Sequence, residues 1–190
     1  ISSAASDVYK RQALVGLPAS QEGRKKKFEE DVETWKAEVE RIDKGCVNGE
    51  AIWAAPDFND AAWKSMKVPG LMQEQDLPGF SGLVWFRKTI DIPAGWAGKD
   101  LILNLGVIDD NDFTYFNGIQ IGHTEGWMAP RSYKIPKELV KKGKAVIAVR
   151  VMDTGGTGGI NGSPESISLH LSDTEAVSYT HLRAHETDSY

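Results

Sequence analysis

The chain contains little cysteine and histidine, no long hydrophobic run and no excess of basic residues. Cys46 is the only cysteine among the 190 residues, so no internal disulfide bond can form. No apolar run reaches the roughly 18 residues that a membrane-spanning helix needs, and we therefore expect no membrane partner. The formal net charge of −5 gives no electrostatic reason to expect binding to nucleic acid.

The two ends of the chain are related at the level of DNA. One DNA segment can encode Asp7–Gln12 on one strand and, read out of frame, Val177–His181 on the other. The pair resembles the translated ends of a sequencing adapter, so we expect residues 1–12 and 176–190 to be non-native. On this interpretation the biological chain is about residues 13–175, encoded by a gene fragment cut at both ends.

Residues 13–45 are expected to form a helical segment. Apolar residues recur over Ser20–Lys44 at spacings of three and four, which predicts an amphipathic helix. This apolar stripe consists of Phe28, Val32, Trp35, Val39 and Ile42. Gly45 follows as a stop signal, and we expect the stripe to pack on a neighbouring domain or on the rest of this chain.

Residues 46–175 are expected to form one β-sandwich. Side chains alternate with a period of two in several short segments, and turn signals separate them, which is typical of an all-β sandwich. The predicted strands are Leu83–Ile92, Asp100–Leu105, Phe113–Phe116, Ile119–Ile121, Arg131–Ile135, Ala145–Met152 and Ser166–Leu171. Asn117 and Gly118 lie between two of them and predict a tight hairpin.

We find no arrangement that predicts catalysis by this chain. A serine hydrolase needs a nucleophile on a sharp turn and a histidine base within reach, and the Gly-x-Ser-x-Gly pattern is absent. Outside the adapter-like ends only His123 and His170 remain, and neither lies in a catalytic motif. The sequence therefore predicts no catalytic residue, no metal site and no cofactor.

Two polar segments could still carry function. Asp109–Asp112 contains three carboxylates that could do acid–base work or bind Ca²⁺, but adjacent residues point in different directions. We interpret the cluster as satisfying turn backbone and nearby Arg or Tyr groups. Gly155–Gly159 lacks the Lys-Ser/Thr pair and the helix of a phosphate cradle, so we interpret it as a loop at the rim of a binding face.

Several motifs taken in order resemble one family. They are Val84–Thr89, Leu105–Asp112, Thr114–Gly118, Glu125–Trp127 and Ile147–Asp153. Together they resemble the galactose-binding-like jelly roll inserted into the SGNH-type hydrolase domain of bacterial sialate O-acetylesterases. The resemblance implies a parent that removes O-acetyl groups from sialic acid or related glycans, with its own hydrolase domain as the partner of this sandwich. It also implies a periplasmic or extracellular location, and the family's catalytic Ser and His motifs are absent here.

Two alternatives remain open. The chain could be the N-terminal sugar-binding sandwich of a family-2-type glycosidase such as a β-galactosidase, although the preceding helix counts against this. It could also be a non-catalytic carbohydrate-binding module. Binding a glycan requires exposed aromatic faces and planar polar groups. The candidate ligand-binding residues are Trp127, Tyr115, Arg131, Asp112 and Asp153, and Trp127, in a loop with Gly126 and Pro130, is the best candidate for exposure.

Overall fold

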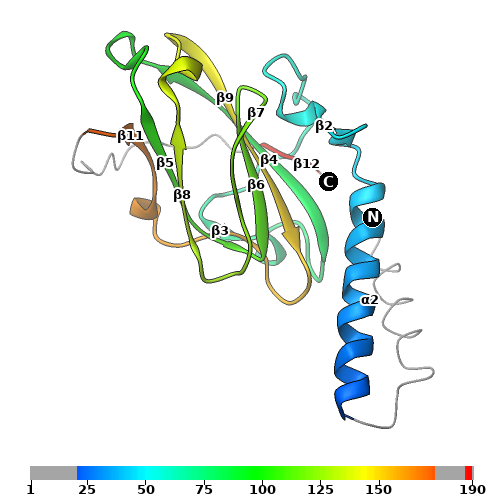
Figure 1. Ribbon diagram of the computed structural model, residues 1–190. Coiled ribbons are helices and arrows are strands. Elements are labelled where there is room, and N and C mark those ends of the chain that lie inside the picture. The colour runs from blue at the N-terminus through cyan, green and yellow to red at the C-terminus, as the bar shows by residue number, and fades with distance from the viewer. Residues whose placement is uncertain (1–20, 174–186, 190) are drawn as a thin grey trace.

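The computed structural model describes residues 21–173 and 187–189. Antiparallel sheets form a sandwich that one long helix precedes, which confirms the predicted fold class (Figure 1). Of the ends predicted to be non-native, residues 1–12 and 176–190, the structure describes only 187–189, which form a strand; the non-native origin of both ends stays a prediction. Within the described part, no helix is long and apolar enough to cross a membrane.

Two five-stranded sheets make up the sandwich. The first, here called the helix-side sheet, runs in the order β12 (Thr187–Ser189), β4 (Gly82–Ile92), β9 (Gly143–Asp153), β6 (Asn111–Phe116) and β7 (Ile119–Thr124). The second, the far sheet, contains β3 (Gly70–Leu71), β10 (Gly159–Asn161), β5 (Leu101–Asp109), β11 (Ile167–Leu171) and β8 (Pro130–Ile135). In the far sheet β5 is central, because β8 pairs with one edge while β11 and β10 share the other.

The remaining elements are short, apart from the helix. A separate hairpin joins β1 (Cys46–Val47) to β2 (Glu50–Ala51). The helix is α2 (Gln21–Arg41), and five single 3₁₀ turns are η1 (Ile52–Ala54), η2 (Met72–Glu74), η3 (Ala94–Trp96), η4 (Lys137–Leu139) and η5 (Pro164–Ser166). The seven predicted strands all occur, whereas the strands β1, β2, β3, β10 and β12 were not among them, because two or three residues are too few to show a period.

The main core lies between the two sheets. Val84 and Phe86 of β4 face Leu103 and Leu105 of β5, and all four are buried. Alternation along each strand sends these side chains inward, and their burial supplies most of the hydrophobic stabilisation. Strand β9 is buried on both faces over most of its length, because the outer face of the helix-side sheet is covered as well.

A second layer covers part of that outer face. Trp85 and Tyr115 stack with ring centroids 5.7 Å apart, and Trp53 packs edge-on against Trp85 at 6.1 Å. Arg87 holds the layer in place, because its guanidinium donates to backbone carbonyls of the layer, including that of Trp53, and pairs with Asp60 at 2.9 Å. The segment from Cys46 to Trp63 is therefore part of the folded domain.

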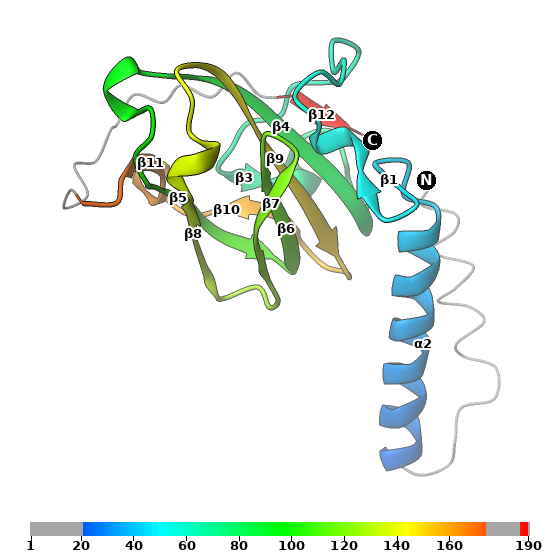
Figure 2. The same cartoon turned by 45° about the horizontal axis from the view of Figure 1, so that its top comes forward.

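Two local predictions have different outcomes. Asn117 and Gly118 adopt φ values of +50° and +82°, as the tight hairpin between β6 and β7 requires, so the hairpin is confirmed. The apolar stripe of the helix is only partly packed. Val39 is buried, whereas Phe28 is 68% exposed. Helix α2 meets the sandwich only through its C-terminal half and projects away from it (Figure 2).

Candidate functional site

Three loops meet at one end of the sandwich, and together they form the loop rim. They are the β5–β6 turn (109–110), the β7–β8 loop (125–129) and the β9–β10 loop (154–158), at the lower end of Figure 1. The carboxylate of Asp110 accepts hydrogen bonds from the backbone N and the Oγ1 of Thr154, at 2.8 and 2.6 Å. The first loop is thus tied to the third.

A buried ion pair holds the rim from below. The side chains of Arg131 and Asp112 are fully buried, and Arg131 Nε donates to Asp112 Oδ1 at 2.9 Å. The guanidinium also donates to the carbonyls of Asp110 and Gly126, at 2.9 and 2.7 Å. The hydroxyl of Tyr133 donates to Asp112 from 2.9 Å. One arginine therefore fixes two of the three loops, and it satisfies carbonyls that would otherwise be buried without donors.

The rim contains two carboxyl groups with opposite pKa shifts. Burial, together with the hydrogen bond and negative charge of neighbouring Asp110, raises the pKa of Asp109 to about 7. Burial also opposes ionisation of Asp110, but hydrogen bonds from Thr154 outweigh it and hold that pKa below its usual value. Near neutral pH the pair can hold one proton, as two adjacent carboxyl groups do when they cannot both ionise.

Asp153 and Gln73 fix the glycine-rich loop. Gln73 Nε2 donates to Asp153 Oδ2 at 2.7 Å, and Gln73 Oε1 accepts from the backbone N of Gly158 at 2.8 Å. Asp153 Oδ1 accepts from the backbone N of Gly155 at 2.8 Å, and burial raises the pKa of Asp153. Two side chains 80 positions apart thus hold the loop at both ends. Sequence reasoning missed Gln73, which no motif distinguishes.

The five predicted ligand-binding residues do not form one surface. Trp127 is 57% exposed on the β7–β8 loop, whereas Asp112, Arg131 and Asp153 are buried beneath the rim. Tyr115 is buried elsewhere, stacked on Trp85 under the outer layer, and burial raises its pKa to about 12. In this conformation the four buried side chains present little or no surface to a ligand, and their predicted role in binding is untested. Ligand binding at Trp127 stays a prediction.

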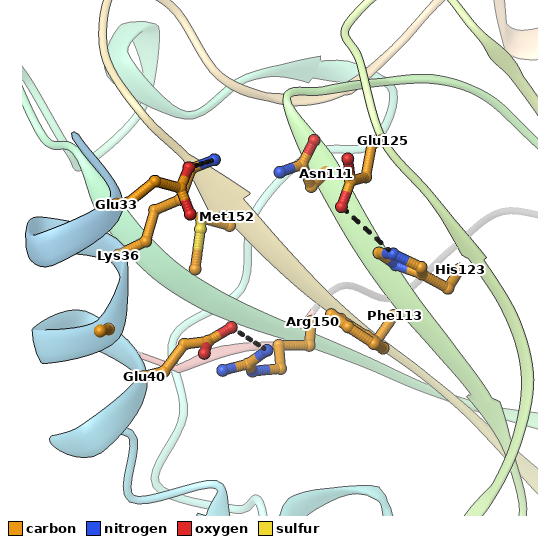
Figure 3. Close-up of a pocket in the computed structure, with 10 residues that line it drawn as sticks. Glu33, Lys36, Glu40, Asn111, Phe113, His123, Glu125, Arg150 and Met152 are labelled. Atoms are coloured by element: carbon orange, nitrogen blue, oxygen red, sulfur yellow. Dashed lines mark hydrogen bonds and ion pairs between the residues drawn. The ribbon is translucent and has the colours of Figure 1, made fainter. Parts of the chain in front are cut away.

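A separate cleft lies between α2 and the outer face of the helix-side sheet, and we call it the helix cleft (Figure 3). Its volume is about 240 Å³. It is lined by Glu33, Lys36, Ala37, Glu40, Asn111, Phe113, His123, Glu125, Arg150 and Met152. Sequence reasoning missed this cleft, because it depends on where the helix docks. The only available signal was the spacing of Glu33, Lys36 and Glu40, which places them on one helix face.

Docking of the helix depends on one carboxylate. Asp43, just beyond α2, accepts from Arg150 Nε at 2.7 Å and from Trp85 Nε1 at 3.0 Å. It also accepts from the backbone N of Gly45 at 2.8 Å. An added Cβ at Gly45 would lie 2.4 Å from the Trp85 ring, so only glycine allows this close approach. The charged network fixes the end of α2 against β4 and β9, and thereby the width of the cleft.

Comparison with solved structures shows what the sandwich is similar to. No family model matches the chain. A Bacteroides uniformis β-glucuronidase shares 25% identity with a TM-score of 0.52, over 60% of this chain and 15% of that one. A second enzyme, B. uniformis β-glucuronidase 2, shares 24% identity with a TM-score of 0.50, over 56% and 14%. The chain thus spans about one seventh of the length of these enzymes, and its fold is a sandwich of the kind they contain.

These comparisons correct one prediction and support another. The resemblance to sialate O-acetylesterases, with its SGNH-type hydrolase parent, is wrong, because the similar structures are β-glucuronidases of the glycoside hydrolase family 2 type. These findings favour the alternative, the N-terminal sandwich of a family-2-type glycosidase, over the esterase interpretation. The motifs pointed to the wrong family because their residues have structural roles. Phe86 packs in the main core, Trp85 packs in the second cluster and Arg87 bonds to the outer layer, and a sandwich can need such residues whatever its parent catalyses.

Proposed function

We propose that this chain is the non-catalytic β-sandwich of a larger family-2-type glycosidase. The observation that carries the proposal is the structural likeness to the B. uniformis β-glucuronidase, at 25% identity and a TM-score of 0.52. The matched region covers 15% of that enzyme, which leaves room for a separate catalytic domain in the parent of this chain. The first substrate class to test in that parent is the β-glucuronides.

The chemistry of the described residues supports an accessory role. Glycoside hydrolysis uses two carboxyl groups about 5 to 9.5 Å apart, on either side of the scissile bond. Asp109 and Asp110 hydrogen-bond to each other directly, so no sugar ring can lie between them. Asp112 is fully buried against Arg131. The carboxylates of the rim therefore act on the protein's own loops, as the sequence interpretation of this cluster proposed.

The histidines support the same conclusion. The Nδ1 atom of His123 lies 2.7 Å from the carbonyl oxygen of Asp112, and its Nε2 lies 3.6 Å from Glu125. His170 is buried, and its Nδ1 has no hydrogen-bond partner. Neither ring is bonded to a serine hydroxyl, among the residues that the structure describes, as a hydrolase nucleophile would require.

The experiment compares the chain with its parent. The uninterrupted gene is recovered and expressed, and both proteins are assayed on nitrophenyl β-glucuronide, on nitrophenyl β-galactoside and on nitrophenyl acetate. We expect the parent to hydrolyse at least one glycoside and the 190-residue chain to hydrolyse none of the three. A parent active only on the acetyl ester would refute the proposal. So would turnover by the chain alone that a single side-chain substitution abolishes.

A further inference from the structure

The helix cleft has the properties of a binding site that the proposed function does not assign. The acidic residues Glu33 and Glu40 and the basic residue Lys36 lie on α2 and face β6, β7 and β9 across the opening (Figure 3). Small-molecule sites are concave and combine apolar surface with a few polar groups. At about 240 Å³ the cleft lies just below their usual range of roughly 300 to 1,000 Å³, so it suits a ligand of one ring.

The charges of the cleft are paired with one another. Lys36 Nζ lies 2.8 Å from Glu33, and Arg150 Nη1 lies 3.8 Å from Glu40. Three carboxylates, including that of Glu125, face two permanent cations, so neither sign dominates strongly. An ionic ligand would have to displace one of these pairs. A neutral ligand with both donors and acceptors can bind between them without leaving a charge unpaired.

The sheet side of the cleft offers planar polar groups beside an aromatic stack. The rings of Phe113 and His123 stack with centroids 4.1 Å apart at an interplanar angle of 16°, and the guanidinium of Arg150 lies over the Phe113 ring, 5.4 Å from its centroid, so the protein's own groups cover that ring. Asn111 uses its Oδ1 to accept from the backbone N of Gly126 at 3.0 Å, and its amide nitrogen points toward the helix (Figure 3). The Asn111 amide and the exposed His123 ring are planar polar groups that can meet the hydroxyl groups of a sugar ring.

Two other ligand classes fit the cleft less well. A metal ion needs several converging ligands, and no group of three His, Cys, Asp or Glu side chains that could hold one occurs between residues 21 and 173. An apolar ligand would have to cover the charged groups Glu40 and Arg150 without compensating them, which is unfavourable. We propose that the helix cleft binds a single pyranose ring of a neutral carbohydrate.

The walls of this site are held in place without a ligand. Arg150 is fixed by Asp43 at 2.7 Å, and His123 by its contact with the Asp112 carbonyl at 2.7 Å. The wall residues therefore need little reordering when a ligand binds, which lowers the entropic cost of binding. The inference rests on these contacts and not on the proposed glycosidase activity. The outcome of the glycosidase assay of the parent therefore neither supports nor contradicts it.

The test is a titration followed by backbone amide NMR of the 190-residue chain. The probes are the methyl β-pyranosides of glucose, galactose and xylose, with sodium glucuronate as the charged comparison. We expect at least one neutral probe to shift the amide signals of Asn111, His123 and Met152 in a saturable manner. The expected dissociation constant is about 1 mM, because a single ring offers few atoms for contact.

A variant that fills the cleft provides the specific control. Ala37 is exposed on α2 and lines the opening, so Ala37→Phe occupies the space without removing any contact. We expect it to weaken binding at least about tenfold, with an unchanged melting temperature, and Ala37→Leu serves if the larger residue disturbs the helix. Trp127→Ala, on the loop rim, should bind the sugar like the parent chain.

Three results would overturn the inference. The first is the absence of a saturable shift with any neutral probe. The second is binding of glucuronate alone, which would mean that charge and not hydroxyl geometry selects the ligand. The third is sugar binding that survives both Ala37 substitutions but is lost in Trp127→Ala, which would place the site on the rim.

Discussion

Removing the cation of the buried ion pair is the sharpest test of how the rim is held. Arg131→Met keeps most of the side-chain length but deletes the guanidinium, and so leaves the fully buried Asp112 carboxylate without its cation. The carbonyls of Asp110 and Gly126 lose their donors as well. Breaking a buried pair by removing one partner costs about 3–5 kcal/mol. That is a large share of the roughly 5–15 kcal/mol that stabilises a typical domain.

Urea denaturation followed by tryptophan fluorescence measures this loss, and a thermal melt should show a fall of roughly 6–20 °C for a chain of this size. Lys134→Met is the matched control. Lys134 lies three residues along the same strand and pairs with Asp100 at 2.5 Å, but its side chain is 60% exposed. Exposed ion pairs are screened by water and salt, so the control should melt like the parent chain.

A double variant separates the charge from the packing. Arg131→Met combined with Asp112→Leu removes both buried charges, and such apolar replacements are often close to neutral when they fit. We therefore expect the double variant to be more stable than Arg131→Met alone, although it contains one more substitution. The reasoning is refuted if the losses of unfolding free energy caused by the two substitutions add in the double variant. It is also refuted if Arg131→Met lowers the unfolding free energy no more than Lys134→Met does.

Two further predictions concern pH and the hairpin. Asp109 keeps its proton up to about pH 7 when folded but loses it near pH 4 when unfolded, so the free energy of unfolding should fall as pH rises through this window. After allowance for solvent screening, the free energy of unfolding should fall by about 1 kcal/mol across this window. Urea denaturation midpoints measured at several pH values test this, and the prediction is contradicted if Asp109→Asn shows the same dependence of stability on pH as the parent chain. Gly118 has φ of +82°, and a Cβ there would approach no atom closer than 3.7 Å, so Gly118→Val should cost about 1–2 kcal/mol through backbone strain alone. Gly118→Asn should recover most of that loss, because asparagine tolerates this conformation, and equal melting temperatures for the two variants would argue against this cause.

The elements of this fold could be predicted where the sequence carries a period or a turn signal. The helix and seven strands show such patterns, and Asn117–Gly118 marks its hairpin unambiguously. Strands β3 and β10 could not be predicted, because they exist only through pairing with each other and with β5. Trp85 and Phe86 are neighbours on β4, so Phe86 lies in the main core, whereas the burial of Trp85 on the other face depends on the outer layer.

The candidate site was less predictable, because it depends on contacts between distant segments. Asp112 and Arg131 are 19 positions apart, and only the facing of β6 and β8 across the sandwich brings them together. The sequence interpretation, in which the acidic cluster bonds to turn backbone and to a neighbouring arginine, agrees with the contacts of Asp110 and Asp112. Asp112 and Arg131 were chosen as ligand-binding candidates from their residue types, and the residue types alone do not reveal that both side chains are buried. Trp127 lies in a loop without strand alternation, and there exposure could be anticipated.

The motifs that first pointed to an esterase show why a sandwich sequence is a weak guide to chemistry. Phe86 fills the main core, Trp85 anchors the aromatic layer and Arg87 ties that layer to the sheet. Each has a role that any two-layered sandwich with such a covering segment requires, whatever its parent catalyses. Most residues of the helix cleft are exposed or only partly buried, the exceptions being Arg150 and Met152 of β9. Function in this chain should therefore be sought where folding places the weakest demands on side-chain identity, and the helix cleft is such a place.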